Sequence, residues 1–234
     1  MVDSKIEGGV ARIFLNRPEK VNALDSAHLD SLLQAIQKTA VDEKVRVVVL
    51  GGHGNAFCGG ADVNELSQLT ESNAGPFVER IHEVCTAIRR LRVPVVARLH
   101  GAVIGAGLEI AAACDLRIAA EGTRFSMPEV RLGIPSVVEA ALLPRLMGSG
   151  RAAWLVLTGE AIDARRAFEW GLIEEIGSDA ELGILLERLL KADREALRMQ
   201  KQLLQLWEEA PLAESVAHSI QLFAQANART RFAP

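Results

Sequence analysis

The sequence predicts an α/β protein in which a core of alternating strands and helices is followed by a helical C-terminal region. Short β-branched runs alternate with segments of helical period through about residue 120, which is the pattern of β-α-β units. After Pro135 the apolar residues recur mostly at helical spacing, and no flexible linker separates the two parts. The 234 residues are 49% hydrophobic, which is ample for one substantial core.

The expected strands are short apolar runs that end in a turn or glycine signal. They cover residues 10–15, 45–50, 93–99 and 115–119. Asp25 and Ser26 offer capping groups for a first helix, and Pro76 is expected to open a second. The helices of the second part are expected over residues 136–148, 150–157, 163–170 and 179–226.

Composition excludes several classes of function. The net charge is −4 with both signs interspersed, so there is no basic stripe for nucleic acid. The longest apolar stretches fall short of the roughly 20 residues that span a bilayer, and the N-terminus lacks a signal-peptide pattern. Cys58, Cys85 and Cys114 show no metal or redox-motif spacing, so we expect reduced thiols, no metal and a cytoplasmic location.

Two glycine-rich segments share one construction: a buried strand, a turn of small residues, and then a helix start. They read GGHGNAFCGGADVNEL (51–66) and HGAVIGAGLEI (100–110). Amide groups at such helix starts lack partners, and two of them converging on one point would form an oxyanion hole, worth about 3–4 kcal/mol per donor. The alternative is that these glycines serve only tight turns and close packing.

Four motifs carry a family resemblance through their order and spacing. They are NRPEKVNAL (16–24), AFCGGADVNEL (56–66), GAVIGAGLEIAAACDLRIAAE (101–121) and FSMPEVRLGIP (125–135). With them the sequence resembles the crotonase, or enoyl-CoA hydratase/isomerase, superfamily from about residue 6 to about residue 225. The resemblance implies a crotonase-like spiral of β-β-α units over residues 1–190. It also implies a C-terminal helical trimerisation region over 191–234, shorter than in typical members, and a homotrimer or a dimer of trimers.

The same resemblance implies that the chain binds an acyl-CoA thioester, with the backbone N–H groups of Ala61 and Ala106 as the oxyanion hole. The Ala106 position is usually glycine in the family. Coenzyme A is part of the substrate, so no separate cofactor is expected. The residues expected to contact CoA or the substrate are Lys20, Val21, Ala23, Gly59, Gly60, Ala61, Asp62, Val63 and Gly105.

Side chains decide among the reactions of the family. Adding water to a double bond needs one group to activate the water and another to protonate the α-carbon, whereas an isomerase needs a single base. Glu109 and Glu129 coincide with the two glutamates of the hydratase branch, which implies Glu109 as base and Glu129 as acid in an enoyl-CoA hydratase of fatty acid metabolism. For Glu109 the alternative is a carboxylate that merely decorates a helix start.

Two other functions remain open. A Δ3,Δ2-enoyl-CoA isomerase, or a dual enzyme, would use Glu129 alone for proton transfer. A non-catalytic RNA-binding member of the superfamily is disfavoured by the acidic charge and by the retention of both glutamates.

The stretch after Glu129 departs from the family pattern. Many members carry PGxGGTQRL where this chain has PSVVEAALLPRL (135–146). Glu139 is therefore an extra acid, which is either a surface helix residue or an inward group that reads a polar acyl chain or acts as an alternative acid. Diene isomerases of the family place their acid nearer Ser136, so this chain does not resemble one. The residues expected at the acyl end are Leu66, Val137, Val138 and Glu139.

Overall fold

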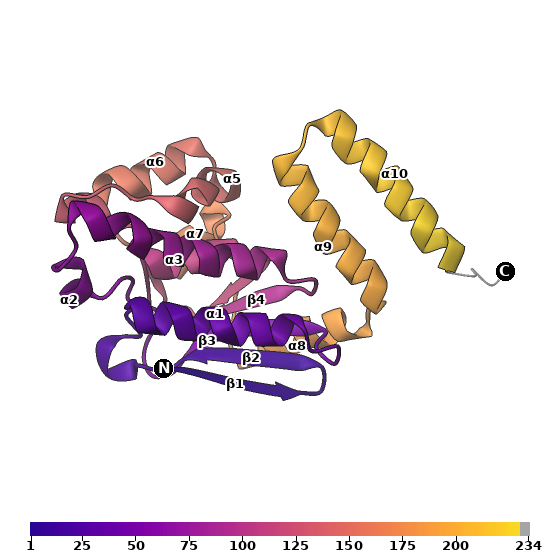
Figure 1. Ribbon diagram of the computed structural model, residues 1–234, viewed down its shortest axis with the longest axis horizontal. Coiled ribbons are helices and arrows are strands. Elements are labelled where there is room, and N and C mark those ends of the chain that lie inside the picture. Colours follow the sequence, from indigo (N-terminus) through magenta and orange to yellow (C-terminus); the bar gives the residue numbers. More distant parts are fainter. Residues whose placement is uncertain (230–234) are drawn as a thin grey trace.

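A six-stranded sheet is the framework of the computed structural model, which describes residues 1–229 (Figure 1). In spatial order its strands are β1 (Val2–Glu7), β2 (Val10–Leu15), β3 (Val47–Gly52), β4 (Val95–Leu99), β6 (Leu116–Ala119) and β9 (Glu175–Ile176). All pairings are parallel except the β1–β2 hairpin. Every residue of the central strand β3 is buried, as expected for a parallel strand that is covered on both faces.

The chain also forms a second, smaller sheet. It consists of β5 (Ala102–Ile104), β7 (Arg124–Ser126) and β8 (Ile162–Asp163), in that order. A bridge between Cys58 and Val103 extends its edge. Successive turns of the chain thus contribute a strand to the large sheet, a short strand or bridge to the small one, and then a helix, which is the expected β-β-α unit.

Helices cover both faces of the large sheet. The helices are α1 (Ser26–Ala40), α2 (Val63–Leu66), α3 (Glu71–Arg90), α4 (Ala106–Ala113), α5 (Leu143–Met147), α6 (Ser149–Thr158), α7 (Ala164–Trp170), α8 (Asp179–Lys191), α9 (Arg194–Glu209) and α10 (Leu212–Arg229), with 3-10 turns η1 (Pro18–Lys20), η2 (Pro128–Leu132) and η3 (Val138–Leu142). Helices α1 and α3 pack on the main core, whose members include Leu29, Ile81 and Leu50. Helix α8 covers the other face, where Leu182 and Leu186 join Val49 in a smaller cluster.

The sequence located the long elements better than the short ones. The strand over Val10–Leu15 is confirmed, and the other expected strands begin within two residues of β3, β4 and β6. The expectation that Pro76 opens a helix is wrong, because α3 begins at Glu71 behind a capping box formed by Thr70 and Asn73. Pro76 lies inside the helix.

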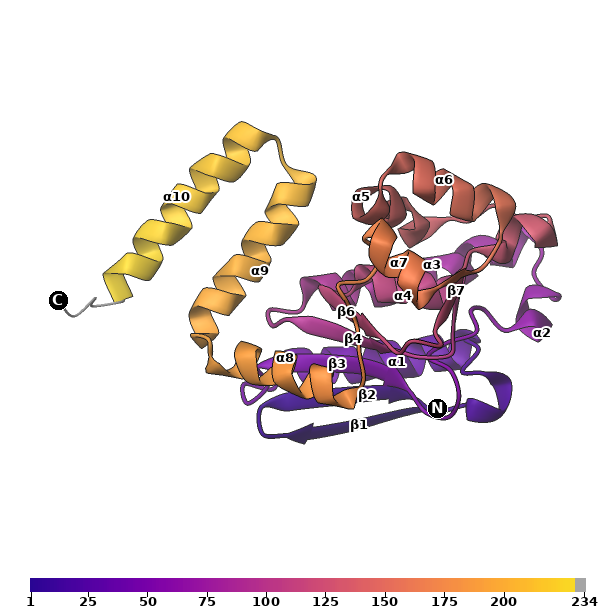
Figure 2. The same ribbon diagram turned by 180° about the vertical axis from the view of Figure 1, so that it is seen from behind.

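The last two helices project from the α/β body (Figures 1 and 2). Helix α9 is fixed to the body by Lys201, which is buried and donates to the Val93 carbonyl at 2.9 Å and to Asp115 Oδ2 at 2.8 Å. Helix α10 packs back on α9, and the two enclose an apolar groove of about 790 Å³. Residues 230–234 of the expected trimerisation region lie outside the described residues, and the division at residue 190 stays a prediction. Over residues 1–229, no helix combines the length and the apolar character needed to cross a bilayer.

Candidate active site

The two glycine loops lie side by side, joined by backbone hydrogen bonds. The Cys58 amide donates to the Ala102 carbonyl at 3.0 Å, and the Ile104 amide donates to the Cys58 carbonyl at 3.0 Å. Gly60 has a φ of +94°, and a Cβ placed there would lie 2.9 Å from the Ile104 carbonyl oxygen and 3.9 Å from the Ala106 nitrogen. Only glycine fits this contact without strain, because it has no Cβ. The missing side chain allows Gly60, the residue before Ala61, to lie against the Ala106 amide.

The amides of Ala61 and Ala106 donate no hydrogen bond to any described residue. Leu24 pairs with the residues on either side of Ala61, because its amide donates to the Gly60 carbonyl and its carbonyl accepts from the Asp62 amide, both at 2.8 Å. The N–H of Ala61 itself therefore points away from Leu24. Ala106 is the first residue of α4, where no carbonyl lies one turn earlier to accept its N–H. The sequence-predicted pair of donors is thus brought together with both N–H groups unpartnered.

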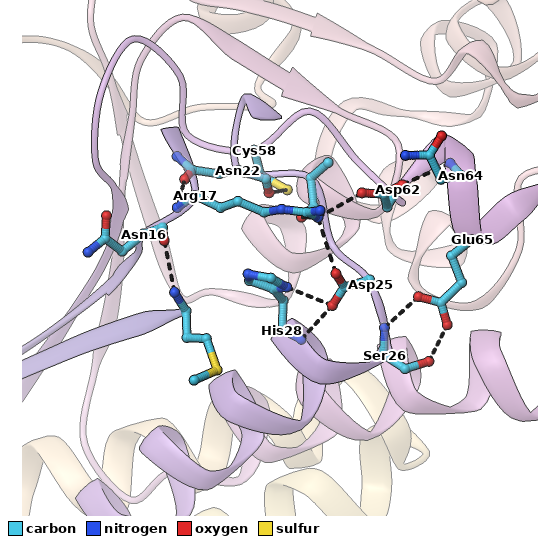
Figure 3. Close-up of polar contacts among 12 residues, drawn as sticks. Asn16, Arg17, Asn22, Asp25, Ser26, His28, Cys58, Asp62, Asn64 and Glu65 are labelled. Atoms are coloured by element: carbon cyan, nitrogen blue, oxygen red, sulfur yellow. Dashed lines mark hydrogen bonds and ion pairs between the residues drawn. The ribbon is translucent and has the colours of Figure 1, made fainter. Parts of the chain in front are cut away.

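Arg17 braces the loop that carries Ala61 (Figure 3). Its Nη1 donates to the Ala23 carbonyl at 3.1 Å and to Asp62 Oδ2 at 2.7 Å, and lies 3.2 Å from Asp25 Oδ2. Burial alone would raise the pKa of Asp62, but the Asn64 amide and the Arg17 guanidinium outweigh burial and hold that pKa below its usual range. The arrangement links the turn after β2 to the segment on either side of Ala61.

Asn22 holds the same turn from the inside (Figure 3). It is almost fully buried, with a φ of 54°, and its side chain donates to the His53 and Ala56 carbonyls at 2.9 and 2.8 Å while it accepts from the Arg17 amide at 2.8 Å. These three bonds use both amide hydrogens and the carbonyl oxygen, and they tie residues 16–24 to the first glycine loop.

The residues expected to contact CoA fall along this braced turn and the adjoining glycine loop. Lys20, Val21 and Val63 are exposed, Ala23, Gly59 and Ala61 are half-buried, and Gly60, Asp62 and Gly105 are buried. The Gly59 amide donates to the Val21 carbonyl at 2.8 Å, so the turn and the loop adjoin directly. The carboxylate of Asp62 is engaged by Arg17 and by the Asn64 amide.

Glu109 lies one turn into α4, a helix whose residues are all buried. Its side chain is covered, and its Oε1 accepts a hydrogen bond from the Ala140 amide at 3.2 Å. Burial, followed by the charge of Glu129, raises the pKa of Glu109 to about 8; the Ala140 amide opposes this increase, and the charge of Glu139 adds a smaller one. Glu109 is therefore not a surface carboxylate at a helix start, and it carries a proton near neutral pH.

Glu129 stands at the start of η2, half-buried, against the second glycine loop. Its Oε2 accepts from the Ser136 hydroxyl at 2.9 Å. Its Oε1 occupies the space that a Cβ on Gly105 would fill. Because Gly105 immediately precedes Ala106, the structure brings Glu129 next to the second unpartnered amide, and the electrostatic effect of Glu129 on Glu109 places the two carboxyls in one site.

Glu139, whose direction the sequence left open, points inward. It is buried, with one carboxylate oxygen 2.8 Å from His82 Nδ1. Val138 beside it has a φ of 39°, which is rare for a β-branched residue. Of the other residues expected at the acyl end, Leu66 and Val138 pack against the main core, whereas Val137 is exposed.

Sequence reasoning missed the side chains that act through tertiary contacts. Arg17 and Asn22 stand in the motif over residues 16–24, but nothing local indicates that they would reach across to the glycine loop. His82 is 57 residues from Glu139 and carried no signal. His100 makes a hydrogen bond through Nε2 with the Gly54 carbonyl at 3.1 Å, as befits a histidine in a turn. Within the described part of the chain, no His, Cys, Asp or Glu residues are grouped so as to hold a metal ion.

Comparisons with known proteins bear on the family and the fold of the chain. The family model described as enoyl-CoA hydratase/isomerase matches residues 5–232. The chain is 33% identical over 219 residues to the 2,3-dehydroadipyl-CoA hydratase of Escherichia coli, covering 92% of this chain and 85% of that protein. It is 36% identical over 178 residues to the short-chain-enoyl-CoA hydratase of Clostridium acetobutylicum, covering 75% and 68%. The crystal structure of an enoyl-CoA hydratase from Mycobacterium smegmatis superposes with a TM-score of 0.93 at 31% identity, covering 96% of this chain and 90% of that one. The expected fold class is thereby confirmed.

Proposed function

The chain belongs to the enoyl-CoA hydratase/isomerase family of the crotonase superfamily, and from that premise we propose that it is an enoyl-CoA hydratase. It adds water reversibly across the double bond of a trans-2-enoyl-CoA to give a 3-hydroxyacyl-CoA. The observation that carries the proposal is the meeting of two carboxyl groups, Glu109 and Glu129, beside the unpartnered amides of Ala61 and Ala106.

The two amides supply the electrostatic part of the reaction. When the oxygen of water bonds to C3 of the enoyl group, the electron pair of the double bond moves toward the thioester and negative charge develops on its oxygen. Donors at Ala61 and Ala106 stabilise that charge, at about 3–4 kcal/mol each in comparable acyl chemistry. They are held rigidly, by Arg17 through Asp62 on one side and by α4 on the other, so little reorganisation accompanies the reaction.

The two glutamates supply the proton transfers. In hydration Glu109 takes a proton from the attacking water and Glu129 delivers one to the α-carbon; in dehydration both transfers reverse. In the free chain Glu109 is protonated near neutral pH, and dehydration requires this protonated form. Hydration therefore begins from the form in which Glu109 is ionised.

CoA binding is assigned to the braced turn and its neighbouring glycine loop. Lys20 is the exposed cation of the turn and is proposed to approach the phosphates, while the backbone of residues 59–63 and Gly105 lines the thioester. CoA enters and leaves as part of the substrate, so the proposal includes no separate cofactor and no metal.

The proposed assembly is a homotrimer or a dimer of such trimers, built through α9 and α10. Trp207, Ile220 and Phe223 line the groove between these helices with half or more of their surfaces exposed. Exposed apolar surface on this scale supports burial against a second copy. Analytical ultracentrifugation tests it, and a monomer at micromolar concentration contradicts it.

The Glu109→Gln variant tests the proposed reaction. Gln keeps the shape of the side chain and still accepts the Ala140 hydrogen bond, but it cannot take a proton from water. Hydration of crotonyl-CoA, followed by loss of the conjugated thioester absorbance, should fall by about 10²-fold or more. Isomerisation of a 3-enoyl-CoA through Glu129, where the wild type shows it, should persist. Near wild-type hydration across pH 6–9 would favour the Δ3,Δ2-enoyl-CoA isomerase instead.

A further inference from the structure

Glu139 is a buried carboxylate that the proposed reaction does not use. Its side chain is 8% exposed, its Oε2 has no hydrogen-bond partner of good geometry among residues 1–229, and the Cys85 thiol lies against the carboxyl. Burying a carboxylate in such surroundings costs folding free energy, and the chain places Glu139 there despite this cost. Its position in the fold shows what it acts on.

The turn around Glu139 holds the Glu109 carboxyl. Val138 adopts a φ of 39°, a conformation that is unfavourable for a β-branched residue. The following side chain, that of Glu139, points into the protein. Glu139 Oε1 is then bound by His82 Nδ1 at 2.8 Å, and the following amide, that of Ala140, donates to Glu109 Oε1 at 3.2 Å. One strained turn thus joins α3, through His82, to the catalytic carboxyl on α4.

The hydrogen bonds around His82 define its role. Thr86 Oγ1 lies 3.3 Å from His82 Nε2. When the Thr86 hydroxyl donates to Nε2, the neutral ring carries its proton on Nδ1 and donates it to Glu139. The His82 side chain is 55% exposed, so the ring bridges solvent and a buried carboxylate.

The titratable groups around the two buried carboxyls come from several elements. Glu109 faces Glu129 on η2, Glu139 on η3 and the Cys85 thiol on α3. Glu139 faces Glu109, Cys85 and His82. Burial, together with the charges of Glu139 and Glu109, raises the pKa of Cys85 well above its usual value, so the thiol stays uncharged. Among these groups, His82 and the uncharged Cys85 thiol are the hydrogen-bond donors that face Glu139.

We propose that Glu139, hydrogen-bonded to His82, is a positioning residue for Glu109: its turn places the Ala140 amide on the Glu109 carboxyl, and its own carboxylate faces that carboxyl in the same buried site. The proposal rests on the proposed function in one respect, which is that Glu109 exchanges a proton with water during hydration. It makes no use of Glu139 as an acid or base toward the substrate.

The test is the pH dependence of kcat/KM for hydration. Because Glu109 must be ionised to activate water, kcat/KM rises with pH through a midpoint that reports its ionisation. Glu139→Gln keeps the size of the side chain and an oxygen for His82 but removes the negative charge. The midpoint should therefore fall by about one pH unit.

Two substitutions of His82 and one control sharpen the test. His82→Leu removes the donor that lies 2.8 Å from Glu139 Oε1, so the Glu139 carboxylate is less stabilised and the midpoint should fall in the same direction as in Glu139→Gln. His82→Gln restores a neutral donor and should keep the wild-type midpoint within about 0.3 unit. Glu83→Gln removes an exposed carboxylate from the adjacent position on α3 and should also leave the midpoint unchanged.

The proposal is overturned if either Glu139→Gln or His82→Leu leaves the midpoint within about 0.3 unit of the wild type. If the wild type does not hydrate enoyl-CoA at all, the proposed function fails, but Glu139 is still testable by urea unfolding. The wild-type chain loses unfolding free energy relative to Glu109→Gln as the pH rises, and the midpoint of this loss reports the ionisation of Glu109. When both proteins also carry Glu139→Gln, this midpoint should fall by about one pH unit. An unchanged pH in that comparison also overturns the proposal.

Discussion

The buried proton on Glu109 predicts a specific dependence of stability on pH. The pKa of this group is about 8 in the folded chain and 4.5 in the absence of its surroundings. A carboxyl whose folded pKa is raised stabilises the fold fully below the unfolded value, and this stabilisation is lost as pH rises through the folded value. The window of loss therefore runs from about pH 4.5 to about pH 8.

The magnitude follows from the size of the shift. A difference of about 3.5 units corresponds to about 5 kcal/mol of unfolding free energy in total, at about 1.4 kcal/mol per unit. Between pH 5 and pH 8 the expected loss is about 3–4 kcal/mol, because Glu109 is still half protonated at the upper limit. Glu109→Gln has no proton to lose and retains the oxygen that accepts from Ala140.

The assay is urea unfolding of the wild type and Glu109→Gln at pH 5, 6.5 and 8, at one protein concentration so that any assembly affects both equally. The unfolding free energy of the variant should increase relative to that of the wild type by about 3–4 kcal/mol from pH 5 to pH 8, while the titrations that the two proteins share cancel in the difference. Glu83→Gln, which removes an exposed carboxylate, should track the wild type. A difference between wild type and Glu109→Gln that stays constant within about 1 kcal/mol from pH 5 to pH 8 would refute the buried-proton reasoning.

Two further substitutions test the oxyanion hole and its brace. Ala106→Pro removes one amide donor at the first position of α4, where proline is well tolerated, so circular dichroism should be unchanged while kcat falls by about 10²-fold; undiminished turnover would show that this amide does not face the thioester. Arg17→Met leaves the buried Asp62 carboxylate without its cation and should cost about 2–4 kcal/mol in urea unfolding, with a lower kcat measured on the folded protein; a loss below about 0.5 kcal/mol would mean that the brace is not structural.

The sequence predicted those parts of the fold that are encoded locally. Continuous β-branched runs predict buried strands such as β3. The Asp25 cap marks the start of α1, where its side chain accepts a hydrogen bond from the His28 amide. The strand β1 was missed because it is an exposed polar edge, and β5 because three residues inside a glycine-rich loop carry too short a pattern. Pro76 was misread because the Thr70 capping box starts the helix upstream of it.

The candidate site divides in the same way. Glu109, Glu129 and the two donor residues could be named from the family resemblance of the motifs, and their roles stay predictions. Their protonation could not be read, since it depends on burial by residues distant along the chain. The contact between His82 and Glu139 joins residues 57 apart and exists only once α3 has packed against η3.

The properties particular to this chain are therefore to be sought where its sequence departs from the family pattern, not in the motifs it shares. The amides and the Glu109–Glu129 pair provide chemistry open to any member that keeps them. The segment over residues 135–142 adds to the effects of burial and Glu129 on how tightly Glu109 holds its proton, because it supplies both the Ala140 amide, which favours ionisation, and the Glu139 charge, which opposes it. These opposing effects come from adjacent residues, so a small change in this turn alters the pH dependence of the proposed reaction, in both directions, without touching Glu109 or Glu129.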